Sequence, residues 1–394
     1  MRESARLQAA IDILDQVIAA SKAGGAAADT LAARYFAGRR YAGSKDRAAV
    51  RELLFQAIRF AAERPPSGRA LLLGLAEQAR PDLLPLFDGG PHAPPPPMAD
   101  EPRSRPSLYP EWLRSELHAR FGQRLDAEAR ALLERAPLDL RVNPLRAGGD
   151  DGRADGRAKV AAALGARPIP GLEHGLRLET PVALDRHPLM QGGAIEIQDA
   201  GSQRAVATAA ARPGETVVDL CAGAGGKTLA LAADMLGEGR LLACDTDRRR
   251  LRAMEPRLLK AGLAAFVERR LLDPGCEGQA LADLAGHADL VLVDAPCSGT
   301  GTWRRNPELR WRLTTERLAG LTAIQSRLID LALPLLKPNG RLVYAVCSVL
   351  DAEGPAQAEA AAARHGLAVR QMLALTPADN GCDGFFVALL GRPC

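Results

Sequence analysis

Two cysteines each follow an apolar run that is typical of a buried strand. Cys297 lies in Asp294-Ala-Pro-Cys-Ser-Gly-Thr-Gly301, directly after Leu290-Val-Leu-Val, and Cys347 closes the run Arg341-Leu-Val-Tyr-Ala-Val-Cys. If both strands belong to one parallel sheet, both thiols face its ligand-binding edge, where a nucleophile has to be. The alternative is that both are small buried apolar residues, because free cysteine is among the most buried residue types.

A glycine-rich segment, Asp219-Leu-Cys-Ala-Gly-Ala-Gly-Gly-Lys-Thr228, ends a strand and opens a helix, so the backbone there can closely approach a ligand. It is not a phosphate-binding Walker A loop, which needs a glycine where Cys221 stands. It is not a dinucleotide fingerprint beginning at Gly223 either, because that pattern needs Gly or Ala where Thr228 stands.

Two further acids follow the next two predicted strands. Asp245 stands where a carboxylate can accept hydrogen bonds from both ribose hydroxyls, and Asp273 where it can accept from an adenine amino group. Each of them alone is more typical of a helix cap or a turn. Together with a loop whose one cation is Lys227, they predict a nucleoside without clamped phosphates, and S-adenosylmethionine rather than a dinucleotide.

These motifs sit on short apolar strands that alternate with helical segments from residue 215 onward, a pattern typical of a doubly wound, mainly parallel sheet. The strands are expected at 216–221, 240–245, 264–268, 288–294 and 341–347.

The motifs Cys221-Ala-Gly-Ala-Gly-Gly-Lys-Thr, Asp294-Ala-Pro-Cys-Ser-Gly-Thr-Gly and Cys347-Ser resemble, in this order and spacing, the Fmu/Sun family of RNA cytosine-5 methyltransferases. Further similar positions extend over about residues 108–390: Pro110-Glu-Trp-Leu, Arg141-Val-Asn-Pro, Gln198-Asp-Ala-Gly-Ser-Gln, Trp303-Arg-Arg-Asn-Pro-Glu, Gln325, Leu336-Lys-Pro-Asn-Gly and Asp383-Gly-Phe-Phe-Val-Ala. The helical start looks like a shortened NusB-like RNA-binding domain. The resemblance implies an α/β fold with a Rossmann-like class I methyltransferase sheet in the C-terminal half.

The resemblance also implies roles for individual residues. Cys347 matches the nucleophile, which adds to C6 of cytosine so that C5 can attack the methyl sulfonium, and Cys297 matches the cysteine that helps to release the product. Asp294 matches the residue that bonds the N3 and amino edge of the base, and it helps most there if burial keeps it protonated. The residues implied to contact the cofactor or the base are Cys221, Ala222, Gly223, Ala224, Gly225, Gly226, Lys227, Asp245, Asp273 and Asp294.

The sequence identifies no group that ionises Cys347, although the site must supply a general base or a positive field. The family more often has Pro at Ala224, Thr at Val346 and Asn at Gly354, and the last difference bears on the support of the site.

Other functions stay open at this stage. A DNA cytosine methyltransferase would use only the cysteine after Pro296, whereas the second one, Cys347, favours the arrangement found in RNA enzymes. Small-subunit ribosomal RNA is the expected substrate, and transfer RNA is an alternative. A non-catalytic RNA-binding or ribosome assembly factor with this fold is the alternative from a different class.

The chain is expected to divide into four parts. Residues 1–88 form a helical domain, 89–107 a Pro-rich linker, 108–195 a small α/β segment and 196–394 the methyltransferase domain. Two basic stretches are candidates for RNA contacts. The alternative for the first is an ordinary solvated helix face, and for the second a tryptophan that is part of the core. One contains Arg34, Arg39, Arg40, Lys45, Arg47, Arg51 and Arg59 beside Tyr35, Phe36 and Tyr41, and the other contains Trp303, Arg304, Arg305, Arg310, Trp311 and Arg312.

The composition of the 394 residues is that of a folded protein, with 47% hydrophobic and 25% charged residues. A net charge of +4 does not by itself identify a nucleic-acid partner. The six histidines lack metal-ligand spacing, and the seven cysteines lack the paired spacing of a zinc site, so no metal and reduced thiols are expected. Without an apolar run of membrane-spanning length or a signal peptide, a cytoplasmic protein is expected, with a monomer as the default.

Overall fold

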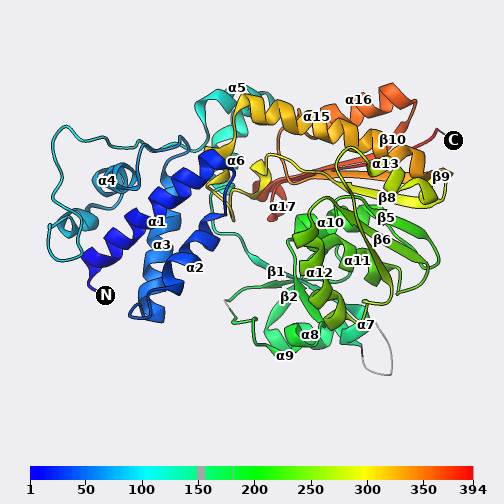
Figure 1. Ribbon diagram of the computed structural model, residues 1–394, viewed down its shortest axis with the longest axis horizontal. Helices are drawn as coiled ribbons and strands as arrows, with labels where there is room; N and C mark the ends of the chain where they lie inside the picture. Colours follow the sequence, from blue (N-terminus) through cyan, green and yellow to red (C-terminus); the bar gives the residue numbers. More distant parts are fainter. Residues whose placement is uncertain (149–155, 181, 394) are drawn as a thin grey trace. The chain divides into compact units, whose positions relative to one another are not determined.

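The computed structural model describes residues 1–148, 156–180 and 182–393, which form two compact units (Figure 1). Unit 1 comprises Met1–Arg135 and Thr302–Thr315, and unit 2 comprises Ala136–Gly301 and Glu316–Cys394. All the candidate cofactor and catalytic residues lie in unit 2. The expected division into four parts stays a prediction.

Unit 1 is helical, as expected for the start of the chain. Its helices are α1 (Glu3–Ala23), α2 (Ala28–Ala37), α3 (Ser44–Phe60), α4 (Gly68–Gln78), η1 (Pro81–Leu86), η2 (Glu111–Leu113), α5 (Arg114–Phe121), η3 (Gly122–Arg124), α6 (Leu125–Ala131) and α14 (Leu309–Arg312), while η6 (Thr300–Thr302) spans the change of unit. The apolar faces of α1, α3 and α4 supply most of its core.

Both tryptophans of the second basic stretch are buried, and Trp311 belongs to this core. Trp303 and Trp311 are 0% and 2% exposed, so neither ring is available to stack on a base. The Trp311 Nε1 donates to the Ala61 carbonyl at 2.9 Å, and the Arg310 guanidinium donates to the Ile58 carbonyl at 2.6 Å. Burial lowers the pKa of Arg310 to about 9. The expectation that these tryptophans stack on RNA is therefore wrong, because both rings are buried, and an RNA contact by the half-buried Arg305 and Arg312 stays a prediction.

The other basic stretch is partly used inside unit 1. The Arg39 guanidinium lies over the Tyr35 ring at 3.6 Å, Arg51 pairs with Asp29 at 2.8 Å, and Arg59 donates to the Arg304 carbonyl. An RNA contact by the rest of this stretch stays a prediction.

The Pro-rich residues 89–107 carry no helix or strand, but they are not a free spacer. Arg69 of α4 donates to the carbonyls of Pro95 and Pro96 and pairs with Glu101 at 2.6 Å. The Ser104 amide donates to the Ala70 carbonyl. These bonds fasten the segment along α4.

Unit 2 begins with a four-stranded antiparallel sheet in the order β2-β3-β1-β4. Its elements are β1 (Leu138–Val142), α7 (Pro144–Ala147), α8 (Gly156–Leu164), β2 (Ala166–Pro168), β3 (Gly175–Leu178), α9 (Pro188–Gln191) and β4 (Ile195–Ile197). Leu140, Val142, Leu176 and Ile195 form the centre of its own small core.

A seven-stranded sheet follows, in the order β10-β11-β9-β8-β5-β6-β7. The five strands from β5 to β9 are parallel, and β10 and β11 are antiparallel. Its strands and helices are α10 (Ala200–Ala209), β5 (Thr216–Asp219), α11 (Gly226–Asp234), β6 (Arg240–Asp245), α12 (Arg248–Ala261), β7 (Val267–Leu271), α13 (Glu277–Ala280), η5 (Ala282–Leu284), β8 (Ala288–Asp294), α15 (Thr315–Ala332), η7 (Leu333–Leu335), β9 (Leu336–Val346), α16 (Pro355–His365), β10 (Ala368–Leu375), α17 (Pro377–Asn380) and β11 (Phe385–Gly391). The Rossmann-like class is confirmed.

Three of the expected strands differ in their bounds, and the first of them, β5, ends at Asp219 instead of residue 221. β7 begins three residues later than expected, because the Phe266 amide donates to the Leu263 carbonyl and closes a turn after α12. β9 begins at Leu336, earlier than expected, and this first residue already pairs with Ala288 of β8.

Helices cover both faces of the large sheet (Figure 1). α10, α11 and α12 supply the core of one face, and α15 and α16 that of the other. α15 is an exception to the expectation that no segment is long and apolar enough to span a membrane, since residues 315–335 pass that test with a mean hydropathy of 1.2. Its Leu328, Ile329 and Ala332 pack in the core of the sheet, the position of a core helix.

We predict that Trp311→Ala lowers the free energy of unfolding of unit 1 by about 3–5 kcal/mol, the usual cost of removing a buried aromatic side chain. Urea unfolding followed by circular dichroism measures this loss. Tyr41→Ala is the control, because this ring is 71% exposed and its removal should change stability by less than about 0.5 kcal/mol. Equal effects of the two substitutions would contradict the core position of Trp311.

Candidate active site

Four polar residues meet at one edge of the large sheet because four neighbouring strands run parallel. Asp219 ends β5, Asp245 ends β6, Asp294 ends β8 and Cys347 directly follows β9. In this sheet the chain continues from β5 to β6 on one side, while β8 and β9 lie on the other side of β5. Ligands of open parallel sheets bind at such a switch point, outside the carboxyl ends of the strands.

The two cysteine side chains are in contact. The Sγ atoms of Cys297 and Cys347 lie 3.3 Å apart, and both side chains are half-buried. The hydrogen bond to Cys347, burial and the negative charge of an ionised Cys347 together raise the pKa of Cys297 well above its ordinary value. Cys297 therefore holds its proton more tightly than an ordinary thiol does, and either sulfur can donate the hydrogen bond between them.

Lys227 supplies the positive charge that the sequence alone did not identify. Its Nζ donates to Asp294 Oδ2 at 2.8 Å and lies 5.3 Å from the centre of the Phe385 ring. Burial opposes its charge, but Asp294 and an ionised Cys347 outweigh burial and raise its pKa. The Lys227 ammonium thus acts on Cys347 as well as on Asp294. The contact with Asp294 has the geometry of an ion pair, and the expectation of a protonated Asp294 stays a prediction.

The glycine-rich loop is held in place by its neighbours. Gly225 precedes α11 with φ +84°, a conformation that favours glycine, and an added Cβ there would overlap the Met254 side chain. The Asp245 carboxylate accepts from the amides of Gly223 and Asp247, both at 2.7 Å. Asp245 is thereby fixed beside the loop, although it keeps further lone pairs for a ligand.

The loop leaves room for a cofactor. A Cβ built on Gly223 or Gly226 meets no atom within 4 Å, so the space beside these two residues is open. The first amides of α11 adjoin this space, and helix N-termini bind carboxylates. The set of open backbone, helix start and Asp245 fits the amino-acid and ribose parts of S-adenosylmethionine. The contacts expected from Cys221, Ala222, Ala224 and the exposed Asp273 stay predictions.

Sequence reasoning missed several functional candidates. The sequence presents Phe385 only as part of the motif that begins at Asp383, and its cation–π contact with Lys227 depends on pairing between distant strands. Glu353 is fully buried between the loops that carry the two cysteines, whereas nearby Asp351 is exposed, and nothing in their spacing separates them. The difference at Gly354 has a physical reason, because a Cβ there would lie 2.8 Å from Cγ of Phe386.

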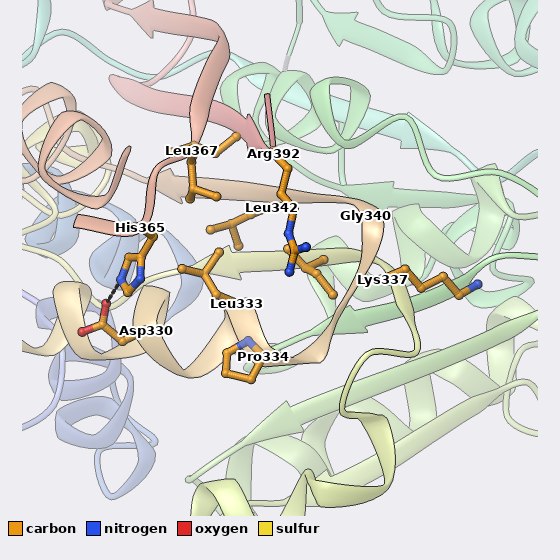
Figure 2. Close-up of a pocket in the computed structure, with 12 residues that line it drawn as sticks. Asp330, Leu333, Pro334, Lys337, Gly340, Leu342, His365, Leu367 and Arg392 are labelled. Atoms are coloured by element: carbon orange, nitrogen blue, oxygen red, sulfur yellow. Dashed lines mark hydrogen bonds and ion pairs between the residues drawn. The ribbon is translucent and has the colours of Figure 1, made fainter. Parts of the chain in front are cut away.

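A separate pocket of about 300 Å³ lies at the opposite edge of the sheet. Figure 2 shows Lys337, Leu342 and Arg392 around it, with the His365 Nε2 atom 2.7 Å from Asp330 Oδ1. Lys337 stands near the start of β9 and Cys347 just beyond its end, which at about 3.3 Å per residue separates them by roughly 30 Å. This pocket does not belong to the candidate active site.

No group of three or more His, Cys, Asp and Glu side chains suited to a metal ion occurs within residues 1–148, 156–180 and 182–393. The six cysteines in this part of the chain are free thiols, and Cys394 lies outside it.

We predict that Lys227→Met raises the pH at which half of Cys347 reacts with iodoacetamide, because the variant lacks the positive charge that favours the thiolate. Peptide mapping by mass spectrometry after reaction at a series of pH values measures this midpoint. Lys337→Met is the matched control, since Lys337 pairs with Asp289 at 2.7 Å at the other end of β9. An unchanged midpoint in Lys227→Met would show that Lys227 does not act on the thiol.

Asp219 gives rise to a second prediction. Burial is the main cause that raises the pKa of this fully buried carboxyl to about 7. Within the described part of the chain, its Oδ1 atom has no hydrogen-bond partner. The folded protein therefore binds this proton more tightly than the unfolded chain, and stability from Asp219 is lost as the pH rises from about 4 to about 7. Each pKa unit corresponds to about 1.4 kcal/mol.

We expect Asp219→Asn to be more stable relative to the parent at pH 8 than at pH 4.5, as measured by urea unfolding of the ligand-free protein. A residual dependence on pH should persist in the variant, because burial also raises the pKa of Asp234 to about 7. If the stability difference does not change with pH, Asp219 does not titrate in this range.

Comparisons with known proteins agree with this geometry. The family model described as 16S rRNA methyltransferase RsmB/F matches residues 206–391, and the one described as its ferredoxin-like domain matches residues 109–185. Ribosomal RNA small subunit methyltransferase B of Erwinia tasmaniensis is 33% identical over 299 residues, and that of Salmonella arizonae is 34% identical over 296. Each match spans 72% of this chain but 66% of the relative, just under two thirds.

Solved structures share the fold. The crystal structure of PH0851 covers 98% of this chain and 99% of its own, with a TM-score of 0.76 and 21% identity. A methyltransferase homologue from Pyrococcus horikoshii covers 72% of this chain and 96% of its own, with a TM-score of 0.62 and 25% identity. With both family models matched and the motifs of the Fmu/Sun family in place, the chain belongs to the RsmB/F family of methyltransferases.

Proposed function

We propose that this protein transfers a methyl group from S-adenosylmethionine to C5 of a cytosine in RNA, with small-subunit ribosomal RNA as the substrate. The observation that carries the proposal is the contact between Cys347 and Cys297, at 3.3 Å, beside the Lys227–Asp294 pair. S-adenosylmethionine supplies a methyl group on a positively charged sulfur. The residues of this chain supply the nucleophile, the proton transfers and the grip on the base.

Cytosine C5 is a weak nucleophile until a thiolate adds to C6. The Cys347 sulfur forms the bond to C6, and the displaced π electrons make C5 part of an enamine that takes the methyl group. A free thiol is only a few per cent ionised at neutral pH. The Lys227 ammonium favours the thiolate, and Cys297 donates a hydrogen bond to it.

Asp294 holds the reacting edge of the base. Its carboxylate pairs with Lys227 and is 30% exposed on its side chain, so it can still accept from the cytosine amino group. As Cys347 adds, negative charge develops on the N3 and O2 side of the ring. Lys227 has further N–H donors, and a cation fixed in place before the reaction stabilises such charge most effectively.

Release of the product needs a base. After methyl transfer the proton on C5 must leave so that its bonding electrons can re-form the C5–C6 double bond and expel Cys347. Cys297 touches the sulfur that has to depart, which supports its role at this stage.

The substrate class follows from access and from the relatives. A base can reach two half-buried thiols only after it leaves its stack, which favours single-stranded or looped RNA. The relatives named above are ribosomal RNA methyltransferases, and this supports a cytoplasmic enzyme that acts on ribosomal RNA.

We expect Cys347→Ala to lower methyl transfer to unmodified small-subunit ribosomal RNA by on the order of 10³-fold or more, because it removes the nucleophile. Cys297→Ala should instead accumulate a protein–RNA adduct, since addition proceeds and release is slowed. Labelled S-adenosylmethionine and a denaturing gel measure both quantities.

Cys276→Ala is the control, because Cys276 is an exposed thiol on the loop before α13. It should behave as the parent does. Methyl transfer by Cys347→Ala at the parental rate would exclude the proposed nucleophile, and binding of S-adenosylmethionine without transfer to any RNA would exclude the proposed substrate class.

A further inference from the structure

A buried polar cluster lies behind the two cysteines, in a region otherwise filled by apolar core. Its centre is Glu353, whose side chain is 0% exposed, and Ser298, Thr300, Gln325 and Ser348 surround it, all of them at most 7% exposed. None of these side chains takes part in the reaction steps derived above. Burying an ionisable carboxyl is costly unless hydrogen bonds compensate, so its presence here needs an explanation.

Glu353 accepts hydrogen bonds from both cysteine loops at once. Its Oε1 accepts from the Ser298 amide at 2.7 Å, and its Oε2 accepts from the Ser298 hydroxyl. The same Oε2 accepts from the Ser348 hydroxyl at 2.6 Å. Ser298 directly follows Cys297 and Ser348 directly follows Cys347, so one carboxylate is hydrogen-bonded to the residue next to each thiol.

Two neighbours complete the connection. Gln325 of α15 donates to Glu353 Oε1 at 3.0 Å and to the Pro296 carbonyl, just before Cys297, at 2.9 Å. The Thr300 hydroxyl lies 2.9 Å from that of Ser348 and accepts from the Val349 amide at 3.0 Å. The Gly301 amide donates to the Cys347 carbonyl at 3.1 Å. The bonds of Thr300 and Gly301 join one cysteine loop to the other, and Gln325 joins α15 to Glu353 and to the loop of Cys297.

Glu353 is also fixed from its own side. The Tyr344 hydroxyl, on β9 within the core, donates to the Glu353 carbonyl at 2.5 Å. Gly354 follows, where the absence of a Cβ lets the chain pack on Phe386. The carboxylate is therefore anchored to the sheet and not to a mobile surface loop.

We propose that Glu353 is a positioning residue that sets the distance between the Cys297 and Cys347 sulfurs by fastening the loop after β8 to the loop after β9. The effect of Glu353 on catalysis rests on the proposed function, whereas its effect on the spacing of the two thiols does not. Loss of the carboxylate removes the acceptor of four hydrogen bonds, which come from the Ser298 amide and hydroxyl, the Ser348 hydroxyl and Gln325, and the two loops then separate or change conformation.

The spacing can be measured without RNA or cofactor. Phenylarsine oxide binds two thiols together only when they lie close: two S–H bonds are replaced by two As–S bonds, and the arsenic-bound oxygen leaves as water with no change of oxidation state. Intact mass spectrometry gives the concentration of phenylarsine oxide at which half of the protein carries the reagent. The binding that remains in Cys347→Ala is subtracted, so that only binding by the Cys297–Cys347 pair is compared.

In Glu353→Gln and Glu353→Ala we expect capture by the pair to weaken by about 10- to 100-fold, the range typical of a lost orienting partner. The kcat of methyl transfer should fall by about 10²-fold, as a small displacement of reacting groups does, with the KM for S-adenosylmethionine nearly unchanged. Glu353→Asp keeps the charge and should restore part of both. Glu359→Gln, an exposed acid on α16, is the matched control and should behave as the parent.

Should Glu353→Ala fail to fold, the double variant Ser298→Ala with Ser348→Ala removes three of the hydrogen bonds and tests the same point. Unchanged capture in a folded Glu353 variant would overturn the proposal, whatever happens to methyl transfer. Glu353-dependent capture in a parent protein that methylates no RNA would support the positioning role and remove the proposed function.

Discussion

The pairing of β8 with β9 is the constraint on which the site depends. In this pair Asp294 lies opposite Ala345, and both strands run in the same direction. The chain therefore leaves both strands at one edge and places Cys297 and Cys347 in adjacent loops, although 50 residues separate them. An antiparallel arrangement of the same two strands would carry the thiols to opposite edges. Parallel pairing alone brings the loops together but does not hold the sulfurs at contact distance, which requires the polar cluster around Glu353.

The charges at this edge favour a positively charged methyl donor. Asp219, Asp245 and Asp294 end three of the parallel strands, and Lys227 is the cation that pairs with one of them. Clustered acids raise one another's pKa, and Asp294 is among the causes that raise the pKa of Asp219. An excess of carboxylates beside an open loop attracts a cation and repels phosphates. The preference for a sulfonium nucleoside over a dinucleotide thus has an electrostatic cause as well as a geometric one.

The parts of this site that follow from local pattern were predictable, and those that follow from distant pairing were not. Short apolar strands between helices indicated the parallel sheet, and small residues after strand ends indicated the loop at Gly223 and both cysteines. The role of Lys227 toward Cys347 depends on the order of strands β5, β8 and β9, which no local pattern records. Glu353 and Asp351 are both acids in the same loop, and only their burial in the folded protein distinguishes the residue that contacts the cysteine loops. The position of Trp311 could not be predicted, because a tryptophan beside arginines is compatible with an RNA-binding surface and with a core. In the structure it packs in the core of unit 1.

The contact between the two sulfurs also explains how one pair of thiols serves two successive steps of the proposed reaction. Two thiols at 3.3 Å do not both carry a negative charge easily, because the charges repel each other. The hydrogen bond to Cys347 and its negative charge are among the causes that raise the pKa of Cys297. When Cys347 bonds to C6, its sulfur becomes a neutral thioether, so the charge is gone and the acceptor is much weaker. The pKa of Cys297 must then fall, and its thiol ionises more readily at the stage when the proton on C5 has to be removed. Addition of one cysteine thus prepares the other as a base, without any movement of the loops that hold them.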